Sequence, residues 1–81
     1  MIFFEEAKSI AIERCDGDIL SISYKSMMIS SSYYPISWRF TIYHKDEDSN
    51  IWKTIIEIKN NGTVLDWYKV FLSDDPEDFI I

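Results

Sequence analysis

The sequence predicts an α+β domain with an N-terminal helix packed on a four-stranded antiparallel meander sheet, followed by a short C-terminal helical turn. Three observations support this prediction. Apolar residues recur every three or four positions near the start of the chain, which is typical of an amphipathic helix. Apolar and polar residues then alternate in later segments, as they do in half-buried strands. Finally, Asn61-Gly62 separates the last two of these segments, and this dipeptide favours a tight hairpin turn.

The helix is predicted over residues 4–15. Glu5 and Glu6 near its start suit the positive end of the helix dipole. Gly17 can adopt a left-handed conformation, so we expect the helix to end just before it. A helix of this length is not stable alone and needs a sheet to pack on. Its apolar stripe is formed by Phe3, Phe4, Ala7, Ile10, Ala11 and Cys15.

Four strands are predicted, joined by polar turns. The second is the clearest, because Ile36, Trp38, Phe40 and Ile42 alternate with polar or amphipathic residues. The segment between the first two strands, residues 26–35, is expected to be a long irregular connection with strand character at 27–29. The predicted strands cover residues 20–25, 36–44, 51–59 and 63–72.

One helix can cover only one face of this sheet. In the fourth strand, one face is expected to carry Leu65, Trp67 and Phe71, and the other Val64, Tyr68, Val70 and Leu72. We therefore expect Trp67 or Tyr68, together with Ile51 and Ile55, to remain at least half exposed. A contiguous exposed apolar patch marks an interaction surface more often than a single exposed residue does.

Composition narrows the classes of partner. Three Trp, five Tyr and five Phe supply the core of a single domain, residues 1–81. The net charge is −6 and the basic residues are scattered, which disfavours nucleic acids and acidic membrane surfaces. A basic protein partner is compatible with this charge, with solubility alone as the alternative. No secretion signal, membrane-length apolar run or cysteine pair is present, so we expect a cytoplasmic protein.

No residue pattern predicts catalysis, a metal or a cofactor. His44, the only histidine, is expected at a strand end facing water; a catalytic role would require Asp46 or Asp48 beside it and a serine nucleophile. No nucleophile motif surrounds any serine. The acids of residues 46–48 lack the glycine and the distal glutamate of a calcium loop, and those of residues 74–78 fit the residue preferences of a helix start. We expect a solvated turn and a helix cap, which together form a negative rim that steers a basic partner.

Four short segments carry a resemblance to a known family: Glu5-Glu6-Ala7-Lys8, Trp38-Arg39-Phe40, Asn61-Gly62-Thr63-Val64 and Asp75-Pro76-Glu77-Asp78-Phe79. In this order they resemble the small bacterial immunity proteins of polymorphic toxin systems that have a PepSY-like helix-plus-meander layout. The resemblance implies a stoichiometric inhibitor without an active site, whose specificity lies in exposed side chains.

We therefore predict a non-enzymatic protein-binding module, an immunity protein that inhibits a bacterial toxin. One alternative is a phage protein that inhibits a DNA-binding enzyme by presenting carboxylates in place of phosphates. Another is a structural homodimer in which the exposed sheet face pairs with itself. The candidate contact residues are exposed aromatics and acids: Tyr33, Tyr34, Asp46, Glu47, Asp48, Trp67, Tyr68, Asp74 and Asp75.

Overall fold

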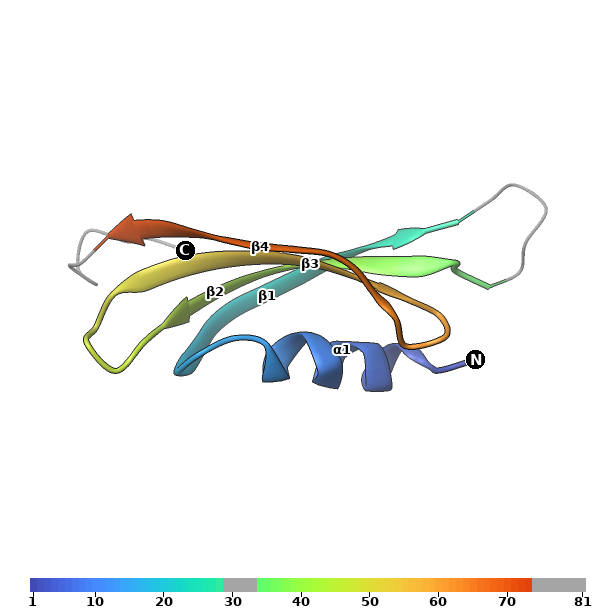
Figure 1. The fold of residues 1–81 in the computed structure, drawn as a ribbon, viewed down its shortest axis with the longest axis horizontal. Coiled ribbons are helices and arrows are strands. Elements are labelled where there is room, and N and C mark those ends of the chain that lie inside the picture. Colours follow the sequence, from blue (N-terminus) through green and yellow to red (C-terminus); the bar gives the residue numbers. More distant parts are fainter. Residues whose placement is uncertain (29–33, 74–81) are drawn as a thin grey trace.

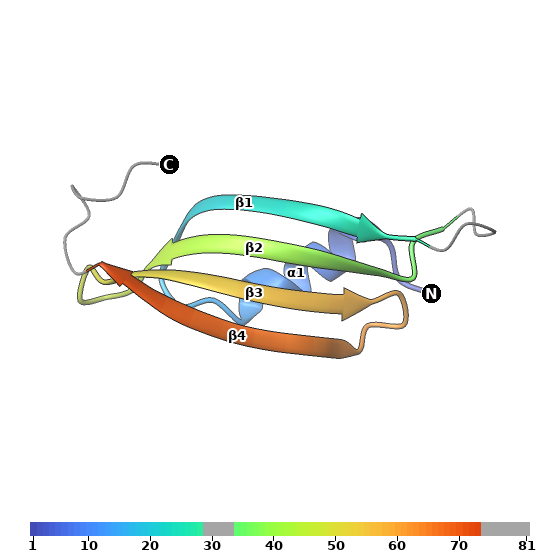
Figure 2. The same cartoon turned by 90° about the horizontal axis from the view of Figure 1, so that it is seen from above.

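The computed structural model describes residues 1–28 and 34–73, and it has the predicted α+β architecture (Figure 1). Consecutive strands pair antiparallel in the order β1-β2-β3-β4, and the helix lies across one face of the sheet (Figure 2). The predicted C-terminal turn and the strand character at Ile29 fall outside the described residues. The elements are α1 (Phe4–Glu13), β1 (Asp18–Met27), β2 (Ser37–Lys45), β3 (Ile51–Lys59) and β4 (Val64–Ser73).

The helix ends two residues earlier than predicted. The backbone N–H groups of Arg14 and Cys15 bond to the carbonyls of Ala11 and Ile12, three residues back, so the last turn tightens. Cys15 is partly buried beside the core, and burial raises the pKa of its thiol. No helix within residues 1–28 and 34–73 is long and apolar enough to cross a membrane.

The hydrophobic core lies between α1 and the two central strands. Alternate residues of β2 face the helix because successive side chains in a strand point to opposite faces. Ala7 and Ala11 are fully buried, and their small side chains let the helix approach the sheet closely. Each large apolar side chain buried here contributes about 1.5–3 kcal/mol. The buried sheet residues of this cluster are Trp38, Phe40, Ile42, Ile56 and Ile58.

Two sequence-based expectations about β3 and β4 are wrong. Val64 pairs with Ile58 and packs against the core on the helix side, because a bulge at Leu65 shifts the register of β4. Ile51 is fully buried and Ile55 is partly buried, although both lie on the face without the helix. An interior strand has neighbours on both sides, and their side chains cover it even where no helix does.

Candidate functional site

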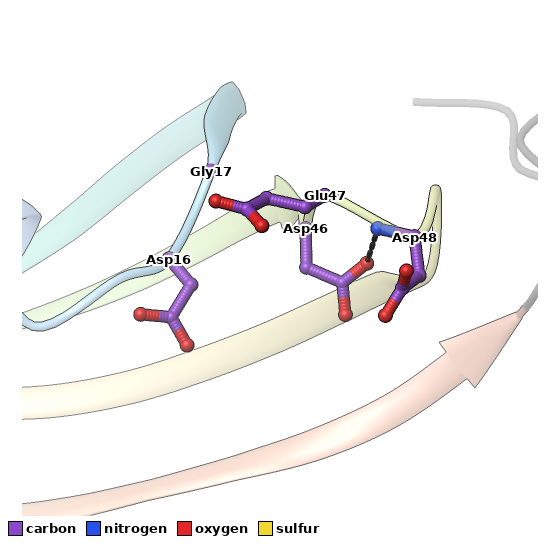
Figure 3. A pocket seen from close by; sticks show the side chains of 5 residues that line it. All are labelled: Asp16, Gly17, Asp46, Glu47 and Asp48. Carbon is purple, nitrogen blue, oxygen red and sulfur yellow. Dashed lines mark hydrogen bonds between the residues drawn. The ribbon is translucent and has the colours of Figure 1, made fainter.

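Two segments far apart in the sequence meet at one end of the sheet (Figure 3). Antiparallel pairing places Asp18 of β1 opposite Lys45 of β2, so the residues before β1 lie beside those after β2. The α1–β1 connection and the β2–β3 loop are thereby held together. Gly17 allows this approach, because a Cβ atom there would overlap the carbonyl oxygen of Lys45.

These segments surround an open acidic hollow of about 300 Å³. Three of its carboxylates belong to Asp16, Glu47 and Asp48, whose residues are exposed. Lys69 reaches the same end from β4, with its Nζ 3.5 Å from Oδ2 of Asp16 and 4.5 Å above the ring centroid of Trp52. Lys45, which directly precedes Asp46 and pairs with Asp18, is also at this end. The four acids that line the hollow still outnumber these two lysines, so this end of the sheet carries negative charge. The hollow is lined by Asp16, Gly17, Asp46, Glu47 and Asp48.

Asp46 organises the β2–β3 loop. Its Oδ1 accepts hydrogen bonds from the backbone N–H groups of Asp48 and Asn50, both at 2.9 Å. Its Oδ2 accepts bonds from Nε1 of Trp52 at 2.9 Å and from Nδ2 of Asn50 at 3.2 Å. The bond from the Trp52 indole, aided by those from Asn50 and Asp48, lowers the pKa of Asp46 from 3.8 to about 2. Asp46 is thus committed to the loop, whereas Glu47 and Asp48 are exposed and line the hollow.

This depressed pKa predicts an acid-dependent loss of stability. The native loop favours ionised Asp46, so its contribution is present above pH 3.8 and declines as the pH falls through about 2. We expect Asp46→Asn to flatten the fall in the thermal midpoint between those pH values. Asp48→Asn removes a charge from the same loop without touching the four bonds, and is the control. Equal pH slopes for Asp46→Asn and wild type would contradict this role.

His44 is buried rather than facing water, so the sequence-based expectation is wrong. Its Nδ1 donates to the backbone carbonyl of Asp16 at 2.8 Å, since a carbonyl can only accept. Its Nε2 lies 2.7 Å from Oγ1 of Thr54. The β2 alternation turns His44 towards the helix side, and the α1–β1 connection bonds to it there. Its ring partners are therefore Asp16 and Thr54, not the acids of the neighbouring loop.

The structure does not gather the sequence-predicted contact residues on one surface. Trp67 and Tyr68 are 45% and 46% exposed, but they lie on opposite faces of β4. Tyr34 is exposed in the β1–β2 connection, at the other end of the sheet from the acidic hollow, because Met27 pairs with Ser37 there and Asp18 pairs with Lys45 beside the hollow. Only Asp46, Glu47 and Asp48 converge. Three further candidates, Tyr33, Asp74 and Asp75, lie outside the described residues.

Sequence reasoning missed Asp16 as part of the acidic end. The signal was available, because a β1–β2 hairpin pairing places the residues before Asp18 beside those after Lys45. Glu57 of β3 and Asp66 of β4 also lie opposite each other in register, away from the acidic end. Arg39 holds Glu57 in a salt bridge of 2.9 Å.

Metal binding finds no support at the acidic end. Among residues 1–28 and 34–73, no group of three or more His, Cys, Asp or Glu side chains is placed to hold a metal ion.

No protein-family model, curated protein or solved structure matches this chain. The kinship with immunity proteins therefore stays a prediction, and the residues of the acidic end must support any function proposed for it.

Proposed function

We propose that this chain is a non-enzymatic inhibitor that binds a basic protein partner, a toxin domain of the same bacterium, in the cytoplasm. The observation that supports this proposal is the acidic hollow, where carboxylates from two separate segments converge. The bonds to Asp46 and the close approach of Gly17 to Lys45 hold these segments in place before any partner arrives. A preordered acidic surface loses less conformational entropy on binding than a flexible one.

Charge gives this surface its selectivity. The chain has a net charge of −6, and Asp16, Glu47 and Asp48 are exposed at one end. Complementary charge accelerates encounter with a basic partner and penalises acidic ones. Such an inhibitor acts by occupying its target stoichiometrically, so it needs no reactive group of its own. The partner chemistry that this surface fits is a cluster of lysine and arginine side chains.

Reversing the two exposed charges of the β2–β3 loop, Glu47 and Asp48, should slow association with the basic partner. We expect the double variant Glu47→Lys/Asp48→Lys to lower the association rate constant by about tenfold or more at low salt. Its folding should change little, because both residues are exposed and Asp46 keeps its backbone donors. The matched control is Glu6→Lys/Glu13→Lys, which makes the same charge change on the exposed surface of α1.

The measurement begins with a tagged pull-down from the source organism's lysate, eluted with salt. Stopped-flow kinetics then compares wild type and both variants against the basic protein recovered, with a growth-rescue assay for neutralisation. Wild type and the α1 control should rescue growth, while the loop variant should rescue poorly. If the loop variant associates and rescues like wild type, charge at this end does not recognise the partner.

A further inference from the structure

Strand β4 is an edge strand whose apolar side chains are unusually exposed. The sheet order leaves β4 without a neighbour on its outer side within the described part of the chain (Figure 2). An edge strand presents unpaired N–H and C=O groups, and proteins commonly guard it with charge, proline or short length. β4 has ten residues and no proline. Six of its apolar residues are 38–51% exposed: Leu65, Trp67, Tyr68, Val70, Phe71 and Leu72.

The lysine of β4 does not guard this edge. By sequence β4 has one acid and one base, Asp66 and Lys69, so its net charge is zero in a chain of net charge −6. Lys69 extends over Trp52 of β3 and towards Asp16, which draws its ammonium group back over its own sheet. The opposite edge strand, β1, also has one acid and one base, but it carries three serines among its ten residues and exposes three large apolar side chains, Ile19, Leu20 and Tyr24, where β4 exposes six. β1 is therefore the more polar of the two edges.

The exposed side chains of β4 lie on both faces of the sheet, which favours contact along the edge of β4 over contact with one face of the sheet. Trp67 and Phe71 lie on the side that α1 covers in part, whereas Tyr68 and Val70 lie on the other side. Stacking another surface on one face would leave the other pair exposed. A strand added beside β4 would contact the side chains of both faces and also pair the free backbone groups.

We propose that β4 pairs antiparallel with β4 of a second copy of this chain, joining two sheets into one. A two-fold axis perpendicular to the sheet makes the interface isologous, so each copy offers the same apolar residues to the other. The arrangement also suits the charges. Antiparallel pairing sends the two acidic ends in opposite directions along ten-residue strands of about 34 Å. This separation exceeds the Debye length of about 8 Å at physiological salt several-fold.

The available area predicts a reversible dimer. Trp67, Tyr68 and Phe71 are each about half exposed, and a fully covered aromatic side chain buries roughly 150–250 Å². Together with the aliphatic residues, pairing covers roughly 300–500 Å² of apolar surface per copy. The two copies together cover roughly 600–1,000 Å², which at most reaches the total of about 1,000 Å² near which specific interfaces begin, so this interface belongs with the weak, transient ones. We therefore expect micromolar dissociation, with the acidic ends of both copies free to bind a partner.

Sedimentation equilibrium of the purified full chain, from micromolar to near-millimolar concentration, tests the proposal. We expect the mass to rise from 9.6 kDa towards twice that value. Val70→Lys places a new cation on the pairing strand of both copies, and should raise the dissociation constant about tenfold or more. Ser23→Lys is the matched control, because it adds the same charge to an exposed position of the opposite edge, β1. A monomer at every concentration, or equal weakening by both variants, would overturn the proposal.

Hydrogen–deuterium exchange of the wild-type chain separates edge pairing from face stacking and does not depend on the folding of any variant. Edge pairing should slow exchange of the β4 amides as concentration rises, with β1 amides unchanged. A dimer whose β4 amides exchange as fast as in the monomer would refute edge pairing. Raising the salt above the physiological level should not weaken this dimer, because its acidic ends are already screened from each other, whereas salt weakens binding of a basic partner. The different responses to salt distinguish a failure of β4 pairing from a failure of the acidic hollow to bind a basic partner.

Discussion

Replacing Gly17 with alanine should destabilise the domain by about 3 kcal/mol or more. Gly17 has φ of +78°, and an added Cβ would lie 2.8 Å from the carbonyl carbon of Lys45 and 2.9 Å from Cα of Asp46. The left-handed conformation alone costs an L-residue roughly 1–2 kcal/mol. The rest of the predicted loss comes from displacing the backbone, because the Lys45 and Asp46 atoms that an added Cβ would meet belong to the main chain. Urea unfolding followed by tryptophan fluorescence measures the loss.

Gly62→Ala is the matched control for this prediction. Gly62 also has a positive φ, of +90°, but the nearest heavy atom to its added Cβ is Cγ2 of Ile2, at 4.0 Å. Only the conformational cost of about 1–2 kcal/mol should remain. Equal losses for the two variants would show that the approach of Gly17 to the β2–β3 loop is not important. A larger loss at Gly17 would show that this approach supports the acidic end.

The elements of the fold could be predicted because their signals are local. Alternation over residues 36–44 is a property of consecutive residues, and the structure has β2 at Ser37–Lys45. The spacing of apolar residues likewise predicted α1, and Asn61-Gly62 predicted the turn between β3 and β4. The meander order then followed from short polar turns, which favour antiparallel neighbours. Each of these inferences needs only a short window of sequence.

The errors arose where a residue's surroundings depend on other strands. The bulge at Leu65 moved Val64 to the helix side, and no local pattern distinguishes this bulge from regular alternation. Ile51 is buried on the face without the helix. Burial of this kind depends on which strands flank β3, so periodicity within β3 could not reveal it.

Only part of the candidate site could be predicted from the sequence, because one part depends on neighbouring residues and the other on how the strands pair. Glu47 and Asp48 were named from their charge and loop position, and the structure has them exposed at one end of the sheet. Asp16 joins them only through the pairing of β1 with β2. The role of Asp46 also required coordinates, because its bond to the Trp52 indole depends on how the loop folds back onto β3.

Substituting His44 with alanine should cost about 3 kcal/mol or more. The change removes a fully buried ring and leaves a cavity against the core. It also removes the ring nitrogens that bond to the Asp16 carbonyl and the Thr54 hydroxyl, although Thr54 keeps its side-chain hydrogen bond with Cys15. A domain of this size has a total stability of roughly 4–12 kcal/mol, so the loss is a large share of it. Urea unfolding gives the value, and a loss below about 1 kcal/mol would contradict the structural role.

Thr54→Val separates the two hydrogen bonds of His44. It keeps the side-chain volume and the bond to Asp16 but removes the hydroxyl, so we expect a smaller loss of about 1–2 kcal/mol. The double variant should lose less than the sum of the single losses, because both substitutions break the same bond. Of the two ring nitrogens of His44, Nδ1 bonds to the Asp16 backbone and Nε2 bonds to Thr54. His44→Ala should therefore shift the amide resonances of Asp16 and Gly17 more than Thr54→Val does, because the buried histidine positions the acidic end as well as stabilising the core.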